Sequence, residues 1–155
     1  MICFAGITLL CFGLDAISKA WVNKNMDVGE SREIAKNRLY IWHIKNKGLP
    51  YNKFEGYMKW IIGSSCILIG VLVQYFIAVF QTRKDKRILW SGAIFFGGAL
   101  GNLIERIRKR EVTDFIYIKA KGLPVFNISD SCICFGGLLF FLSSLFIKEK
   151  NQKNQ

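Results

Sequence analysis

The sequence predicts a membrane protein that is mainly α-helical: a bundle of four transmembrane helices with a small β excursion in one loop. Three observations support this fold class. The chain of 155 residues is 52% hydrophobic, with a mean hydropathy of +0.26, yet it carries a net charge of +11. Its apolar residues form four blocks, each near the ~17–25 residues needed to cross a bilayer, and its charges lie between these blocks. Tryptophans mark where three of the blocks begin or end, as in an aromatic belt.

The four apolar blocks define the expected helices, at about 2–22, 60–81, 88–104 and 128–147. The first block could be a cleaved signal peptide, but it lacks a basic segment before its apolar run. It also carries Asp15, Ser18 and Lys19 at its far end, which a discarded peptide would not need. We therefore expect it to be retained as a membrane helix, with both termini on one side of the membrane.

Two loops are expected to carry structure of their own. The loop at about 23–59 is too long for a tight connection. Its residues 39–44 are aromatic and β-branched, which is typical of a strand. The second loop, at about 105–127, begins with a basic turn, and its residues 112–118 also read as a short strand.

Two carboxylates stand out because they lie at the two ends of the connection between the third and fourth blocks. Asp114 alternates onto the apolar face of its strand, and Asp130 begins the last block. Asp130 alone could simply favour a helix N-terminus, but that does not explain Asp114. Carboxylates brought close together cannot both ionise cheaply, so one keeps its proton while the other stays charged. Such a pair suits acid–base chemistry on a water molecule.

Other polar groups in the apolar blocks have two interpretations. Asp15 and Lys19 are spaced i, i+4, so they could form an interfacial ion pair with Lys19 snorkelling to the surface, or they could serve a site. The glycines at 97 and 101 predict a helix-packing face. Asn102 and Arg106 follow on one helix face near the carboxylates.

The sequence offers little for metal or nucleotide chemistry. All five cysteines fall in apolar blocks, where a thiol behaves as a small hydrophobe, and no disulfide framework is implied. The single histidine, His43, reads as a strand residue at the membrane interface. Neither a phosphate-binding loop nor a nucleophile elbow occurs in the sequence. We expect no metal, no cofactor and no nucleic-acid partner.

Five motifs in order resemble the motif set of the lipoprotein signal peptidase family, also called signal peptidase II. They are DAISK at 15–19, NKG at 46–48, GGALGNLIER at 97–106, VTDFI at 112–116 and FNISDS at 126–131. The resemblance implies a bacterial inner-membrane aspartic peptidase, in one domain over residues 1–155. It would remove signal peptides from diacylglyceryl-modified prolipoproteins, just before the lipidated cysteine. Both termini would lie in the cytoplasm and the β-rich loop outside; the Lys and Arg distribution alone does not decide this sidedness.

The resemblance also assigns residues and partners. By motif position, Asp114 and Asp130 match the catalytic pair. The positions that match substrate-binding or supporting residues are Asp15, Lys19, Asn46, Gly48, Gly98, Asn102, Arg106 and Asn127. The implied partners are lipid-modified prolipoproteins, membrane lipids and cyclic-peptide inhibitors such as globomycin.

The chain departs from the family pattern around the expected pocket, at Leu49, Pro50, Tyr51, Glu105 and Ser129. These departures leave the reaction class intact and bear on the range of substrates and inhibitors. The alternative is a non-enzymatic four-helix membrane protein, either a small transporter or an assembly factor. A transporter is expected to hold an acid in mid-span, whereas here the acids cluster near helix ends and in one connection.

Overall fold

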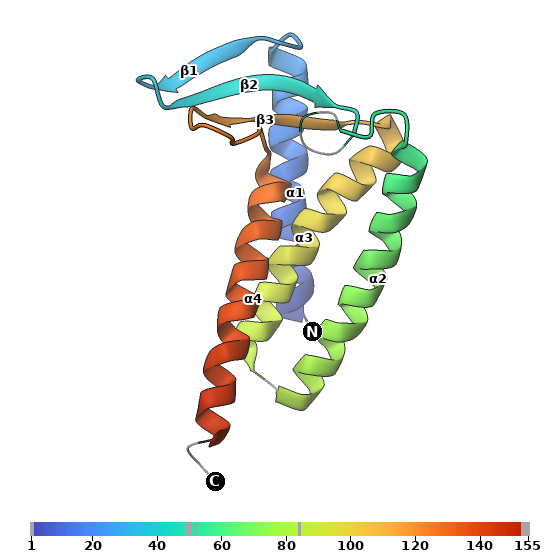
Figure 1. The fold of residues 1–155 in the computed structure, drawn as a ribbon, viewed down its shortest axis with the longest axis vertical. Coiled ribbons are helices and arrows are strands. Elements are labelled where there is room, and N and C mark those ends of the chain that lie inside the picture. Colours follow the sequence, from blue (N-terminus) through green and yellow to red (C-terminus); the bar gives the residue numbers. More distant parts are fainter. Residues whose placement is uncertain (1, 49–50, 52, 84, 153–155) are drawn as a thin grey trace.

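The computed structural model describes residues 2–48, 51, 53–83 and 85–152, and within them it contains four helices and three strands (Figure 1). The helices run side by side, and the sheet lies across one end of the bundle. In chain order the elements are α1 (Ile2–Asn25), β1 (Ser31–Ala35), β2 (Leu39–Asn46), α2 (Met58–Arg83), α3 (Lys86–Lys109), β3 (Val112–Ile118) and α4 (Ile128–Gln152). The expected architecture of four helices with a small sheet is confirmed.

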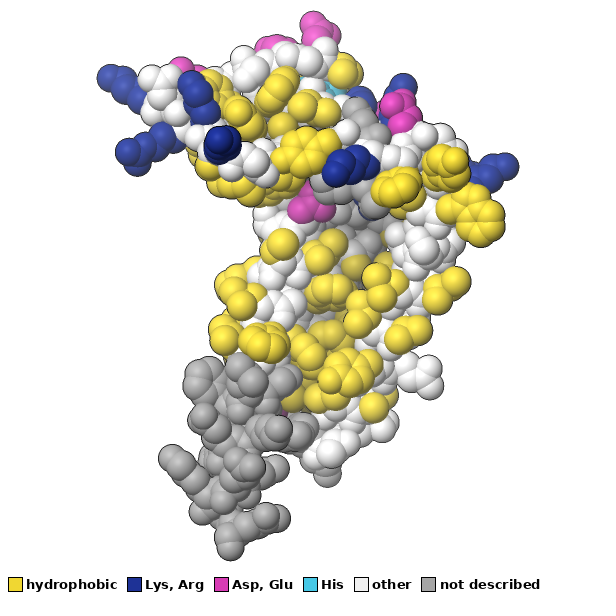
Figure 2. Space-filling view, viewed as in Figure 1, with side chains coloured by type: hydrophobic (Ala, Val, Ile, Leu, Met, Phe, Trp, Pro, Cys, Tyr) yellow, Lys and Arg dark blue, Asp and Glu magenta, His cyan; other side chains and the backbone are white. Residues whose placement is uncertain are grey.

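The helices have the length and composition of membrane spans. Of the described helices, α1, α2 and α3 each contain a stretch long and apolar enough to cross a bilayer, and α4 contributes a shorter apolar stretch, Ile128–Ser143. In Figure 2 hydrophobic side chains cover the visible faces of the helices, whereas Lys and Arg side chains gather around the sheet. The exposed helix residues include Leu9, Leu10, Ile67, Leu68, Val71 and Phe141. This distribution suits a bundle surrounded by lipid, with the sheet beyond the hydrocarbon.

Each helix extends past its expected range because polar residues continue the last turns. In α3 the helix begins after Asp85, whose carboxylate caps it by accepting a bond from the Arg87 amide. The helix ends at Lys109, and the next residue, Arg110, caps it in a left-handed conformation by donating its amide to the Arg106 carbonyl. Hydropathy marks only the apolar part of a span, whereas these caps set where the backbone leaves the helix.

Helix α3 lies at the centre of the bundle and packs against α1, α2 and α4. Glycines allow its close approach on two sides. A Cβ on Gly97 would lie 2.6 Å from the Cys11 Cβ of α1, and one on Gly98 would lie 2.4 Å from the Ser129 carbonyl oxygen of α4. The expected packing face of small residues is confirmed, and it presses α3 against the first turn of α4.

The sheet is antiparallel with strand order β1-β2-β3. Strand β2 pairs with β3 so that Ile44 faces Asp114, and the register shifts between Ile41 and Ile44. Strand β1 was not expected from the sequence, because all five of its residues are exposed and no apolar alternation marks it.

A small core fixes the sheet to α1. Val22 of α1 and Met26, which directly follows this helix, pack against Phe115 of β3. His43 is buried and its Nδ1 lies 2.9 Å from the Met26 carbonyl oxygen, so it ties β2 to the end of the same helix. Phe115 adjoins Asp114 in the chain, so this core holds the strand that carries the carboxylate.

Candidate active site

Asp114 is buried in β3, with 4% of its surface exposed, and two side-chain amides hold it. Asn127 Nδ2 donates to its Oδ1 at 2.7 Å, and Asn46 Nδ2 donates to its Oδ2 at 3.1 Å. Asn46 is oriented in turn by the Gly48 amide, which donates to Asn46 Oδ1 at 3.1 Å. Gly48 therefore supports the site through its backbone, two residues after the strand end that supplies Asn46.

Asp130 lies in the first turn of α4 and belongs to a reciprocal helix cap. Its Oδ2 accepts from the Asn127 amide at 3.1 Å, while Asn127 Oδ1 accepts from the Asp130 amide at 2.9 Å. This exchange is a capping box, which fixes both side chains against the start of the helix. Asn102 of α3 donates to Asp130 Oδ1 at 2.7 Å.

Asn127 connects the two carboxylates. Its side-chain nitrogen donates to Asp114 Oδ1. Its side-chain oxygen accepts from the Asp130 backbone amide, and its own backbone amide donates to Asp130 Oδ2. The same nitrogen lies 3.2 Å from Asn102 Oδ1. The structure thus brings together the two predicted acids and the three predicted asparagines in one hydrogen-bonded cluster.

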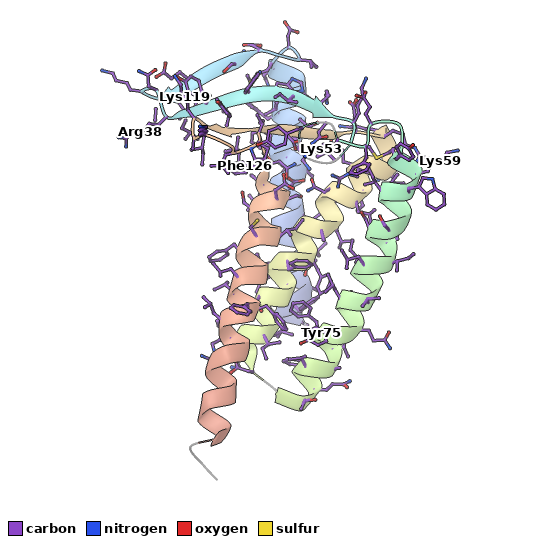
Figure 3. All side chains as sticks on the ribbon, viewed as in Figure 1. Arg38, Lys53, Lys59, Tyr75, Lys119 and Phe126 are labelled. Carbon is purple, nitrogen blue, oxygen red and sulfur yellow. The ribbon has the colours of Figure 1, made fainter. Side chains whose placement is uncertain are left out.

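Both carboxylates line one cavity of about 540 Å³. Most of its wall is apolar, and it includes Val112, Leu123, Phe126 and Ile133. Figure 3 shows Phe126 under the sheet at the head of α4, where this cavity lies.

Arg106 adds a positive charge to the wall of this cavity. Its Nε is buried and has no hydrogen-bond partner among the described residues. The guanidinium interacts electrostatically with both acids, more strongly with Asp130 than with Asp114. A cation with an unused donor beside two acids is suited to hold a carbonyl or carboxylate oxygen of a ligand.

Burial, together with the negative charge of Asp130, raises the pKa of Asp114 from its ordinary value of 3.8 to about 6. The hydrogen bonds from Asn46 and Asn127 oppose this rise because they favour the ionised carboxylate. Asp114 can therefore keep its proton into mildly acidic solution. A carboxyl group that stays protonated beside an ionised one can act as a general acid.

Asp15 and Lys19 are not among the residues that line this cavity. They contact residues that position its wall, Ser129 and Asn102. Both are buried, so the interpretation of Lys19 as a snorkelling interfacial residue is wrong. Lys19 Nζ lies 2.7 Å from Asp15 Oδ2 and 3.2 Å from Glu105 Oε2, and it donates to Asn102 Oδ1 at 2.8 Å. A lysine held by two carboxylates thus orients the asparagine that bonds Asp130.

Asp15 also caps α4. Its Oδ1 accepts from the Ser129 amide at 2.8 Å, one residue before Asp130. Gly98 and Gly101 make this contact possible, because a Cβ on Gly101 would lie 2.7 Å from Asp15 Oδ2. Gly98 therefore acts through packing, by holding α3 against the turn that carries Asp130.

Two supporting residues were missed as site residues. Glu105 was noted only as a departure, yet its Oε1 accepts from Thr113 Oγ1 at 2.8 Å and its Oε2 from the Thr113 amide at 3.1 Å. Thr113 directly precedes Asp114, so this clamp fixes the strand beside the acid. The available signal was a second polar residue beside Asp114, in a strand whose other residues are apolar or aromatic. Of the pocket departures, Leu49 and Pro50 lie outside the described residues.

No group of three or more His, Cys, Asp or Glu side chains in the described part of the chain could hold a metal ion. The fold and the paired carboxylates, one buried and one half-buried, are together typical of an integral-membrane hydrolase.

Comparison with known proteins identifies the family. Residues 7–146 match the family described as Signal peptidase (SPase) II. Two solved structures, each described as a bacterial membrane enzyme structure obtained by the in meso method, are similar at 27% sequence identity. The first gives a TM-score of 0.87 and covers 100% of this chain and 92% of that one; the second gives 0.85 and covers 94% of each. The chain belongs to the signal peptidase II family, which is a family of aspartic peptidases.

Proposed function

We propose that this protein removes the signal peptide from diacylglyceryl-modified prolipoproteins, cutting just before the lipidated cysteine. The observation that carries the proposal is the cluster in which Asn127 joins Asp114 to Asp130 at the wall of one cavity. The whole chain, residues 1–155, acts as one peptidase domain of the bacterial cytoplasmic (inner) membrane. Its termini face the cytoplasm, and the sheet stands outside.

The two acids divide the chemistry between them. Asp130 is the ionised member, because the Arg106 guanidinium interacts more strongly with it than with Asp114. Asp114 is the protonated member, because its pKa is raised to about 6. A water molecule between them attacks the scissile carbonyl carbon as Asp130 takes its proton and Asp114 protonates the carbonyl oxygen.

The resulting tetrahedral diol then collapses. The C–N bond breaks as Asp130 gives its proton to the leaving amine and Asp114 recovers its proton from the hydroxyl group. The products are a carboxylic acid on the signal peptide and a free amine on the lipidated cysteine. Both aspartates return to their starting protonation states, so the pair acts as a unit.

The position of the dyad suits a substrate held in the membrane. Asp130 begins α4 and Asp114 lies in the sheet, so the scissile bond is placed where the bundle meets the sheet. The apolar wall of the cavity would receive the signal peptide beside the cut. The exposed apolar helix faces provide the contact with membrane lipids.

The test is cleavage of a purified diacylglyceryl-prolipoprotein in detergent, followed by mass spectrometry of both products. Asp114→Asn and Asp130→Asn should each lower turnover on the order of 10²–10⁴-fold because proton transfer is removed, while the variants remain folded. The matched control is Asp27→Asn, an exposed residue outside the cavity, which should cleave normally. Globomycin should compete with the substrate in the same assay.

Near-normal turnover by either active-site variant would refute the dyad assignment. A wild-type protein that is folded, yet fails on a substrate that another signal peptidase II cleaves, would favour the non-enzymatic alternative.

A further inference from the structure

A second cavity, of about 430 Å³, adjoins the proposed catalytic cavity. The two share Asn46, Asp114 and the segment 123–125, so they meet at the carboxylate of β3. The second cavity is therefore open to a chain that passes the dyad, and the proposed chemistry on the first cavity does not use it.

The two cavities extend in different directions. The residues found only in the first come mainly from α3 and α4: Arg106, Ser131, Ile133 and Cys134 are among them. Those found only in the second come from the sheet and from the segment between β2 and α2: Trp42, Ile44, Tyr51 and Tyr117. Because the sheet lies across the end of the bundle (Figure 1), the second cavity lies at that end, beside β2 and β3.

An aromatic pair forms one wall of the second cavity. Trp42 and Tyr117 meet edge to face, with ring centroids 5.2 Å apart and planes at 74°. The register shift of β2 falls between Ile41 and Ile44, where Trp42 lies. Bulges of this kind redirect side chains beside active sites. The irregularity in β2 accounts for the direction in which Trp42 faces Tyr117.

A hydrogen bond joins two segments that form another part of the wall of the second cavity. The Tyr51 hydroxyl donates to the Gly122 carbonyl oxygen at 2.8 Å, which links the segment after β2 to the turn after β3. Tyr51 holds a left-handed backbone, with φ of 65°, which is a costly conformation for a residue with a side chain. Among the described lining residues of this cavity, Asp114 is the only acid, and none is basic.

The following inference rests on the proposed function. A prolipoprotein at the dyad has its signal peptide in the membrane and its mature part outside, so the mature part must leave over the sheet. We propose that Trp42, Tyr51 and Tyr117 form a subsite for the mature side of the substrate. The subsite takes an extended peptide with an apolar side chain and disfavours an acidic one, because Asp114 and Asp130 lie next to it.

Strand spacing indicates which substrate residue reaches the subsite. Ile44 pairs with Asp114, and Trp42 lies two residues before Ile44 in β2, at most about 7 Å away at ~3.3 Å per residue. An extended substrate covers the same distance in two residues. The residue that directly follows the lipidated cysteine is therefore the one that packs on Trp42.

The test uses three diacylglyceryl-prolipoprotein substrates that differ only at the residue after the cysteine, which is Leu, Gly or Asp. For the wild type we expect kcat/KM to fall about tenfold from Leu to Gly, the scale of discrimination by an apolar pocket, and to fall again for Asp. Trp42→Ala should lose the preference for Leu over Gly, because the apolar side chain of the Leu substrate loses the ring that it packs on. Trp42→Phe should largely keep the preference. The control is Trp60→Ala, a residue 78% exposed at the start of α2 and outside both cavities, which should keep it fully.

A second variant tests the subsite independently, in case Trp42→Ala does not fold. Tyr51→Phe removes only one hydroxyl, and it should reduce the preference for Leu several-fold as the wall loosens. Equal cleavage of all three substrates by the wild type would overturn the subsite and leave the proposed function standing. Equal slowing of all three by Trp42→Ala would also overturn it, as the mark of a merely structural residue. Failure of the wild type on every substrate would instead count against the proposed function.

Discussion

The raised pKa of Asp114 predicts that ionising this group destabilises the fold. The shift from 3.8 to about 6 means that the folded protein binds this proton more tightly than the unfolded chain does. The stabilisation is fully present below about pH 4, and it is lost as the pH rises through about 6. At ~1.4 kcal/mol for each tenfold change in proton affinity, the loss is about 3 kcal/mol.

Asp114→Asn isolates this contribution, because asparagine does not titrate. Between pH 4 and pH 8 the wild type should lose about 3 kcal/mol more stability than the variant, which corresponds to several degrees in Tm. The assay is thermal unfolding of both proteins in one detergent across this pH range. The comparison of slopes matters here, because an asparagine cannot accept bonds from both Asn46 and Asn127 and so lowers the absolute stability at every pH.

The control for the pH series is Asp27→Asn, whose side chain is exposed and should leave the wild-type slope unchanged. Parallel pH dependence of wild type and Asp114→Asn would refute the argument. It would mean that solvent reaches the carboxylate and that Asp114 is not poised to hold a proton.

Three further predictions follow from the contacts around the site. Arg106→Lys should lower kcat/KM by at least tenfold although the charge is kept, because a planar fork of donors is lost; unchanged kinetics would show that Arg106 supplies charge alone. Gly98→Ala should lower Tm, since its Cβ would lie 2.4 Å from the Ser129 carbonyl oxygen, whereas Gly63→Ala, with no neighbouring atom within 4 Å, should not; equal Tm values would contradict the packing role. Lys19→Met should cost about 3–5 kcal/mol by leaving its carboxylate partners buried without a cation, and a variant as stable as the wild type in thermal unfolding would argue against the buried ion cluster.

The sequence was informative wherever a local property decides the outcome. Hydropathy and block length predicted the helices, because a span must keep apolar side chains against lipid over a fixed length. Asp114 and Asp130 stood out for the same reason, since carboxylates near bilayer depth are costly unless a site needs them. The ordered motifs then indicated the signal peptidase II family, to which the chain belongs.

The sequence was less informative where contacts come from distant parts of the chain. Strand β1 has no inward-facing side and so left no pattern to read. Lys19 looked equally suited to a snorkelling pair, because nothing local shows that Glu105 and Asn102 close over it from α3. Thr113 passed unnoticed because its partner Glu105 lies on another element.

The sequence by itself thus determined the membrane class, the spans and the acids at issue, since each depends on the free energy of placing a residue type in lipid or water. Only the tertiary structure decided how those residues act. Asn127 joins the two acids because the cap of α4 faces the end of β3, and Gly98 lets α3 approach that cap. Hydrogen bonds of about 3 Å depend on the packing of separate elements, which no local pattern specifies.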